Sequence, residues 1–264
     1  MKTLFISAAL ASLLLSCNAK YDNGFSFNVT QKEGKGPLTD REFKMNFDEI
    51  KVMQSIDAEL IKSTEEKVVI SAPSDIIDDV LVENSGGKLY IHFKSGINIS
   101  SRNVRAKIYA KDFSKIEAAS SASINIKDKF TQDRTAVEVS SSASISGSLE
   151  ANEMSIDVSS SGSFSGEIWA VNLKSEVTSS GEITISGKTK NAEIEASSSG
   201  TLNAQHVVAE NAEIEASSSG TVNLSVSRQL NASASSSGDV SITRKGNLNV
   251  VSQKESSGGS VSIQ

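Results

Sequence analysis

Six carboxylates recur in the later part of the chain at intervals of 19 to 21 residues: Glu117, Glu138, Asp157, Glu176, Glu195 and Glu215. If each interval is one turn of a stacked structure, neighbouring carboxylates lie about 4.8 Å apart. Like charges this close raise one another's pKa unless cations intervene, and Ca²⁺ accepts carboxylate oxygens in variable geometry. We favour a solvated face, offset by Lys115, Lys174 and Lys188, over a row of calcium sites. We therefore assign no metal ligand and no cofactor.

No residue is assigned a catalytic role. His92 and His206 are far apart in sequence, and neither has a metal-ligating partner at helical or turn spacing, so both are interpreted as ordinary strand residues. The sequence has no Gly-rich phosphate loop and no Gly-x-Ser-x-Gly elbow. The many serines lack an adjacent base, so their abundance does not indicate a nucleophile.

Trp169 is the only tryptophan and lies beside Ile168 and Val171. An exposed tryptophan can stack on a sugar or a partner's ring, whereas a buried one fills a wide corner. We expect Trp169 to be buried. Phe164 belongs to an apolar column and is expected in the core.

The only cysteine, Cys17, ends an N-terminal segment that has the features of a signal peptide. Lys2 precedes an apolar run from Leu4 to Leu15, which is about half the length that a bilayer core requires. The ending Leu14-Leu15-Ser16-Cys17 resembles the lipobox of bacterial lipoproteins, whose cysteine becomes the acylated first residue. We expect residues 1–16 to be a signal peptide, Cys17 to be lipidated, and residues 17–40 to form a flexible tether.

The composition restricts both the partners and the core. The formal net charge of −6 argues against nucleic acid and anionic lipid surfaces as ligands. Aromatic residues make up only 5% of the chain, so the core must be filled by small and branched side chains.

An internal repeat is the main structural signal. The segment from Asn191 to Thr201 recurs letter for letter from Asn211 to Thr221. Weaker copies are aligned by the small residue that ends each serine run, here called the marker. The markers are Ala122, Ala143, Gly162, Gly181, Gly200, Gly220, Gly238 and Gly259.

The columns of the repeat predict strands. The residue two after the marker is apolar in all eight copies and the next residue is polar, which is the alternation of a half-buried strand. The residues six and four before the marker predict a second strand, which fails in the last copy at Gln253 and Glu255 and so suggests a capping coil. A coil of 19–20 residues is too short for a strand–helix–strand unit. The pattern therefore predicts an all-β, parallel β-solenoid over residues 116–264.

A serine stands two residues before every marker: Ser120, Ser141, Ser160, Ser179, Ser198, Ser218, Ser236 and Ser257. We expect these serines to point inward or line a bend, with hydroxyls that can hydrogen-bond along the stack. The small marker indicates either crowding or a positive φ. Because Ala122 and Ala143 are accepted there, crowding is the better explanation.

Residues 41–115 are less regular. Val68–Ile70, Leu89–Phe93 and Val104–Ile108 alternate as strands, and Asn84–Gly87 is a turn signal. Asp75–Leu81 can be one helical turn or a further strand. The region is either the entry to the solenoid or an antiparallel layer that covers its first coil, because an uncovered coil would expose an unpaired strand edge.

The lipobox, the strand-rich segment ending in Lys111-Asp-Phe-Ser-Lys-Ile116 and the Ser-Ser-Ser-Gly coils together resemble the putative auto-transporter adhesin, head GIN domain family of Bacteroidetes. The resemblance spans most of the chain after Cys17. It implies a right-handed, single-stranded β-helix and an adhesive or envelope role, and it brings no catalytic residues.

We therefore expect a non-enzymatic lipoprotein of the outer membrane, anchored through Cys17 on either the surface or the periplasmic side, that presents a rigid rod to a glycan or protein partner. Oligomeric state is not predicted. One alternative is a carbohydrate-active β-helix enzyme, which a groove with two or more acidic residues and Lys or Arg opposite would favour. A periplasmic scaffold or stress-sensor component is another.

Overall fold

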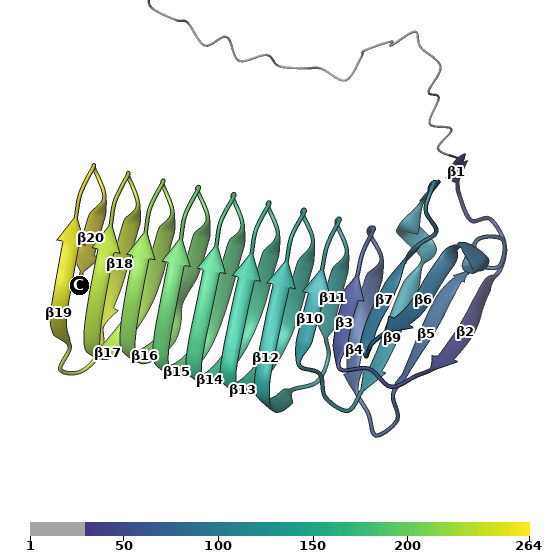
Figure 1. Ribbon diagram of the computed structural model, residues 1–264, viewed down its shortest axis with the longest axis horizontal. Coiled ribbons are helices and arrows are strands. Elements are labelled where there is room, and N and C mark those ends of the chain that lie inside the picture. The colour runs from purple at the N-terminus through teal and green to yellow at the C-terminus, as the bar shows by residue number, and fades with distance from the viewer. Residues whose placement is uncertain (1–29) are drawn as a thin grey trace, which may run out of the picture.

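The computed structural model describes residues 30–264, which form a rod of stacked β-coils joined to an irregular β-cap (Figure 1). The expected signal peptide and Cys17 lie outside the described residues, as does most of the expected tether. Within residues 30–264, no helix is long and apolar enough to span a bilayer.

The cap covers residues 30–110 and mixes parallel and antiparallel strands. Its elements are β1 (Thr30–Lys32), β2 (Leu38–Lys44), β3 (Glu49–Val52), β4 (Asp57–Lys62), β5 (Lys67–Pro73), the 3₁₀ turn η1 (Ile77–Asp79), β6 (Val80–Ser85), β7 (Lys88–Phe93), β8 (Ile97–Ile99), the 3₁₀ turn η2 (Ser101–Asn103) and β9 (Arg105–Ala110). The expected tether is thus wrong in its last part, because β1 and the start of β2 fall within residues 30–40.

The regular part contains the repeat and, unlike the cap, only parallel strands. Its strands are β10 (Lys115–Ala118), β11 (Ser123–Ile126), β12 (Phe130–Val139), β13 (Ser144–Val158), β14 (Ser163–Val177), β15 (Glu182–Ala196), β16 (Thr201–Ala216), β17 (Thr221–Ala234), β18 (Asp239–Arg244), β19 (Asn249–Glu255) and β20 (Ser260–Ile263). Each strand pairs with its counterpart one coil later, as Ile145 does with Phe164, and the register shifts locally in the β15–β16, β16–β17 and β17–β19 pairs. The predicted parallel β-solenoid is confirmed.

The stacked coils begin in the cap, before the expected start at residue 116. Strand β3 pairs in parallel with both β7 and β10, and β4 pairs in parallel with both β9 and β11. The coil formed by β3 and β4 therefore lies between two pairs of strands that come later in the sequence. On one side are β7 and β9, and on the other are β10 and β11, the first strands of the repeat. Antiparallel β2, β5 and β6 then cover the end, with β5 on β9, β2 on β5 and β6 on β7. Both readings of residues 41–115, solenoid entry and antiparallel layer, describe part of it.

The predicted apolar columns form the core. The residues two after the marker are all buried, from Ile183 at 0% exposed to Val261 at 7%. The columns six and four before the marker are buried too, including Ser175, whose hydroxyl donates to the Ile156 carbonyl over 3.4 Å. Gln253 and Glu255 in the last copy are exposed, as their polarity indicates.

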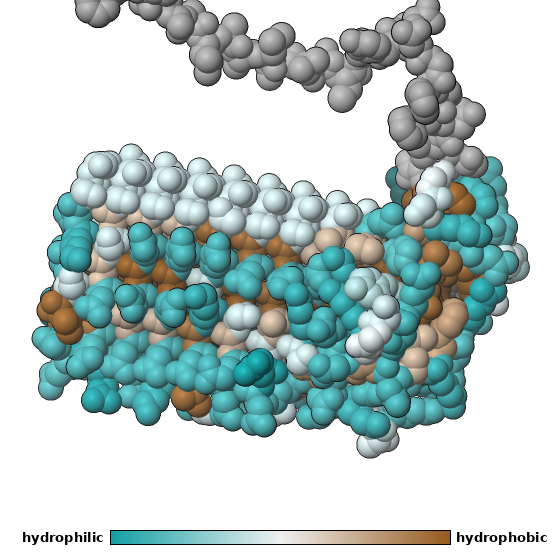
Figure 2. Space-filling view, viewed as in Figure 1, coloured by the Kyte–Doolittle hydropathy of each residue, from teal (hydrophilic) through white to brown (hydrophobic). Residues whose placement is uncertain are grey.

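Each serine run is a tight turn. In all eight copies the marker N–H donates to the carbonyl three residues earlier, as Gly200 does to Ser197 over 2.8 Å. The first central residue is always serine and the second is serine in seven turns and Gly258 in the last, all with positive φ near 50–80°. This is the type I′ geometry, which usually takes Asn or Gly. In Figure 2 the turns form a pale ridge along one long edge of the rod.

The serines of this ridge line a bend and are exposed, so they do not point inward. The ladder that joins successive turns runs through the backbone, because the N–H of each second serine donates to the carbonyl of the first central serine one coil later, as Ser180 does to Ser198 over 3.1 Å.

Crowding at the marker has a clear physical cause. A Cβ built on Gly220 would lie 2.2 Å from the Ala196 carbonyl oxygen, and one on Gly238 would lie 2.4 Å from the Ala216 oxygen. No marker glycine has a positive φ. The structure therefore supports crowding over a left-handed conformation.

Candidate functional site

A long groove of about 850 Å³ crosses six successive coils on one face of the rod. Two rows, polar at every position except Ala136, border it. The row at the bend of each coil is Arg134, Glu153, Asn172, Asn191, Asn211 and Gln229, and the row nearer the serine ridge is Ala136, Ser155, Lys174, Glu193, Glu213 and Asn231. Buried residues between the rows form the floor: Thr135, Met154, Leu173, Ala192 and Ala212.

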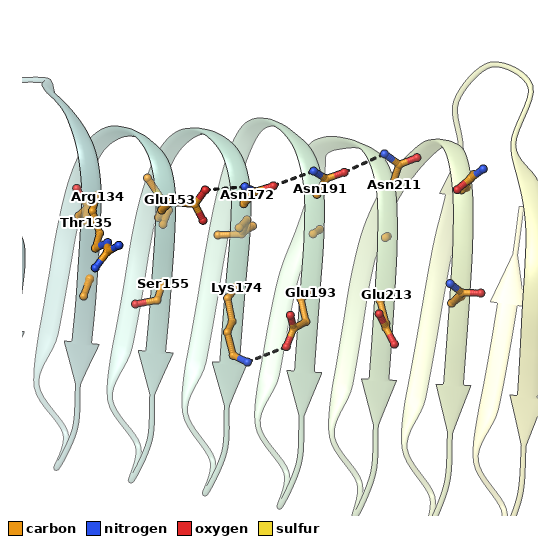
Figure 3. A pocket seen from close by; sticks show the side chains of 17 residues that line it. Arg134, Thr135, Glu153, Ser155, Asn172, Lys174, Asn191, Glu193, Asn211 and Glu213 are labelled. Carbon is orange, nitrogen blue, oxygen red and sulfur yellow. Dashed lines mark hydrogen bonds and ion pairs between the residues drawn. The ribbon is translucent and has the colours of Figure 1, made fainter.

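A ladder of side-chain amides runs along the bend of the groove (Figure 3). Asn211 donates from Nδ2 to Oδ1 of Asn191 over 2.9 Å, and Asn191 donates to Asn172 over 2.7 Å. Asn172 donates to the Glu153 carboxylate over 2.6 Å. The amides thus all donate in the same direction along the rod, which presents a preorganised row of polar groups.

The groove also carries charge of both signs. Lys174 pairs with Glu193 of the next coil, with 2.7 Å between Nζ and Oε1, and both side chains are more than 60% exposed. Arg134 is the register neighbour of Glu153. Exposed pairs of this kind contribute little to folding stability. Their side chains are therefore free to exchange partners with a polar ligand.

The line of six carboxylates lies beside the groove, one row closer to the serine ridge. The side chains face outward, as predicted, and four of them, Glu117, Glu138, Asp157 and Glu176, border a hollow of about 330 Å³. Burial first, and then the neighbouring carboxylates Glu176 and Glu138, raise the pKa of Asp157. The mutual repulsion expected from the spacing therefore appears at the centre of the line.

The end of the line nearest the cap behaves differently. Burial alone would raise the pKa of Glu117, but hydrogen bonds and charge from Lys51 and Lys88 outweigh it and lower that pKa. Lys88 Nζ lies 3.0 Å from Oε2, and Lys51 contacts the other oxygen. Of the three expected lysine partners, Lys115 pairs with Glu138 at 2.5 Å.

The other two expected lysines do not form ion pairs with the line, although the charge of Lys174, like that of Lys115, opposes the rise in the pKa of Asp157. Lys174 pairs with Glu193 in the groove, and Lys188 lies in the column of Trp169 on another side of the coil. Lys51 and Lys88 were missed because β3 and β7 reach the line only through the non-sequential pairing of the cap. Among residues 30–264, no three His, Cys, Asp or Glu side chains are arranged to hold a metal ion.

The expected burial of Trp169 is wrong. Its side chain is 37% exposed and belongs to an outward column with Glu150, Lys188 and Val208. The coil is already filled at this level by Ile168 and Ala170, which are both buried, so the corner needs no larger residue. Phe164 is in the core as expected, at 1% exposed.

The two histidines lie in separate strands. His92 is in β7, where Nδ1 lies 2.9 Å from the Phe93 carbonyl and Nε2 lies 3.2 Å from Glu83. His206 is exposed in β16. The structure does not bring them together.

Sequence reasoning missed the groove itself. One signal was available, because Asn191 and Asn211 occupy the same place in the two identical repeats and Asn172 precedes them by one repeat. A polar column at the bend of a coil is the feature that marks this surface.

The family model for the putative auto-transporter adhesin, head GIN domain matches residues 46–246. This range includes the groove and most of the cap. No curated protein sequence matches the chain.

Several crystal structures share the fold. A putative adhesin from Parabacteroides merdae is 18% identical, with a TM-score of 0.79 over 89% of this chain and 100% of that one. A putative adhesin from Parabacteroides distasonis is 18% identical, with a TM-score of 0.81 over 88% and 98%. A putative lipid binding protein from Parabacteroides distasonis is 22% identical, with a TM-score of 0.73 over 89% and 100%. At these identities the likeness concerns the fold.

Proposed function

Because the chain belongs to the putative auto-transporter adhesin, head GIN domain family, we propose that it is an adhesin-like binding protein whose ligand occupies the groove. The observation that carries this proposal is the amide ladder of Asn172, Asn191 and Asn211 beside an apolar floor. Binding sites typically combine such a floor with a few well-placed polar groups. The ligand is a glycan or a protein of the cell's surroundings.

Filling the groove tests this proposal. Ser155→Arg places a long side chain among the groove residues, and Ser146→Arg is the matched control, because Ser146 is also half-buried in β13 but lies outside the groove. The purified protein is screened on an array of bacterial and host glycans and proteins. We expect Ser155→Arg to lose the strongest signals at least tenfold and Ser146→Arg to keep them. Equal signals from both variants would overturn the groove as the binding surface.

We also propose that Cys17 is lipidated and holds the rod on the outer membrane. The lipobox and the lone cysteine support this proposal. Several acyl chains on one residue would give a stable anchor. Mass spectrometry of the N-terminal peptide tests the modification, and Cys17→Ala should release the protein from the membrane fraction. Protease treatment of intact cells then distinguishes the outer surface from the periplasmic side.

One observation favours a second candidate, a polysaccharide-cleaving enzyme. The groove holds Glu153, Glu193 and Glu213 together with Arg134 and Lys174, and glycosidases use a pair of carboxylates. Against this, the Glu193 side chain is 64% exposed and already paired with Lys174, whereas a general acid usually needs a buried carboxyl with a raised pKa. Chromatography of bound polysaccharides after incubation tests it, because the binding proposal predicts unchanged chain length.

A further inference from the structure

We infer that the ligand of the groove is a neutral, extended polysaccharide lying along the rod axis with about one sugar per coil. This inference rests on the proposed function, since it names the ligand of the same groove. Three properties of the groove carry it: its direction, its period and its hydrogen-bonding chemistry.

The direction follows from the strands that line it. Each of the six strands from β12 to β17 contributes residues at equivalent register positions. The long axis of the groove therefore runs across the strands and along the rod. A bound chain meets the same kind of surface at every coil, and only a polymer can use the whole length.

The period separates a polysaccharide from a peptide. Coils repeat at about 4.8 Å, whereas an extended peptide advances about 3.4 Å per residue. A peptide would fall out of register with the coils within a few residues. A pyranose in an extended, equatorially linked chain advances by close to one coil, although alternate sugars face opposite ways. Each sugar therefore stays level with one coil, and every second sugar presents the same hydroxyls to the groove.

The chemistry of the amide row suits hydroxyl groups. In the ladder, Asn191 uses one of its two amide hydrogens to reach Asn172 and accepts one hydrogen bond from Asn211. One donor and further acceptor capacity then remain at each such amide. A sugar hydroxyl both donates and accepts, so it can satisfy the two together. Glu213 in the second row can accept from a neighbouring hydroxyl.

The charge in the groove favours a neutral chain. Glu153, Glu193 and Glu213 outnumber Arg134 and Lys174, and the adjacent line of carboxylates adds more negative charge. A uronic-acid polymer or a nucleic acid would be repelled. No aromatic side chain lines the groove, so affinity must come from hydrogen bonds to many sugars and not from stacking on one.

This arrangement predicts how affinity depends on ligand length. Each added sugar reaches a new coil within one continuous site, so the dissociation constant should fall severalfold per sugar. It should level off at about six sugars, because the groove spans six coils. A helical, axially linked glucan cannot follow the straight groove and should bind weakly at every length.

Isothermal titration of the full chain with neutral β-1,4-linked glucose, mannose and N-acetylglucosamine series, from disaccharide to octasaccharide, tests the inference. At least one series should show the length dependence, while the malto-oligosaccharide control should not. Asn191→Ala should weaken binding about tenfold. Asn203→Ala is the matched control, because Asn203 is also half-buried and accepts from Asn223 over 3.0 Å outside the groove. No binding by any β-1,4 series, or binding independent of length, would overturn the inference.

A Ser- and Asn-rich extended peptide is titrated in parallel. If it binds and Asn191→Ala abolishes that binding, the groove is still the adhesive surface, but its ligand is a peptide and the polysaccharide inference fails alone. If Asn191→Ala and Asn203→Ala weaken every bound ligand equally, the groove proposal fails as well.

Discussion

The cap and the regular solenoid use the same coil but stabilise it differently. Fully buried leucine and isoleucine occur in both regions, such as Leu89 in the cap and Leu202 in the solenoid, but the solenoid also contains many buried alanines, such as Ala196 and Ala216. The cap is held together by antiparallel strand pairs and ion pairs, each of which occurs only once. The solenoid instead repeats the same kind of contact between each coil and the next. The comparison indicates that the cap specifies where stacking begins, and the regular coils supply a uniform surface on which polar residues can vary.

The largest expected effect comes from truncating a core side chain in the cap. Leu89 in β7 is fully buried and stacks on Ile50, a large buried side chain of the next coil, so Leu89→Ala should destabilise the protein by about 4 kcal/mol. Ile194 lies in the same inward column and is 2% exposed, but the coil before it contributes only Ser175 there. Ile194→Ala should therefore cost only about 2 kcal/mol. Urea unfolding followed by circular dichroism measures both, and equal losses would remove the distinction between the regions.

A second effect tests crowding at the markers. Gly220→Ala forces a Cβ to within 2.2 Å of the Ala196 carbonyl oxygen, so the stacked turns must shift, at about 2 kcal/mol. Ala122 occupies the equivalent position next to the cap and already accommodates a Cβ. Ala122→Gly should change stability by less than about 1 kcal/mol. A neutral Gly220→Ala variant in the same unfolding assay would argue against crowding.

Within the line of carboxylates, Glu117 and Asp157 should make the folding stability depend on pH with opposite signs. The lowered pKa of Glu117 means that its contribution is present at neutral pH and is lost as pH falls through the folded-state value. Glu117→Gln should destabilise by about 1–2 kcal/mol at pH 7, since it weakens charged hydrogen bonds to Lys51 and Lys88. The loss should shrink in acid. Destabilisation that is equal at pH 3 and pH 7 would contradict this assignment.

The raised pKa of Asp157 has the reverse consequence. Its ionised form is disfavoured in the fold, so stability rises as pH falls from above the folded-state value towards the unfolded one. Asp157→Asn should therefore stabilise the protein at pH 7, by roughly 0.5 kcal/mol because solvent screens a half-buried group. The gain should disappear below about pH 4. Thermal unfolding at pH 3 and at pH 7 compares this variant with Glu117→Gln. A destabilised Asp157→Asn variant at pH 7 would refute the repulsion between Asp157 and its neighbouring carboxylates.

The smallest expected effect is at Trp169. Because the side chain is 37% exposed, its fluorescence should be quenched readily by acrylamide, and Trp169→Ala should change stability by less than about 1 kcal/mol. As the only tryptophan, it reports on one position without interference. Resistance to the quencher would show that the Trp169 ring is shielded from solvent.

Much of the solenoid was predictable because its signal repeats. The alternation around each marker identified the buried columns, and Ala122 and Ala143 pointed to crowding. The serines were harder to interpret, because a residue with a Cβ rarely adopts positive φ, and strict alternation placed them inward. In the turns, that alternation is broken by two consecutive left-handed residues.

The remaining features depend on contacts that no local pattern contains. The coil of β3 and β4 lies between strands that are distant in sequence, so the lysines that reach Glu117 could not be assigned. The groove arises because the two polar rows around Leu173 and Ala192 border a floor at the coil bend. The prediction that Trp169 is buried rested on its residue type. Residue type alone does not determine whether a side chain at the corner of a coil points into the core or into solvent.

A crystal structure of the protein with its tightest-binding ligand from the array tests the central claim most directly. The account predicts ligand density along Asn172, Asn191 and Asn211, parallel to the rod axis and in step with the coils. Density over the cap, on the serine ridge or against Trp169, with an empty groove, would contradict it.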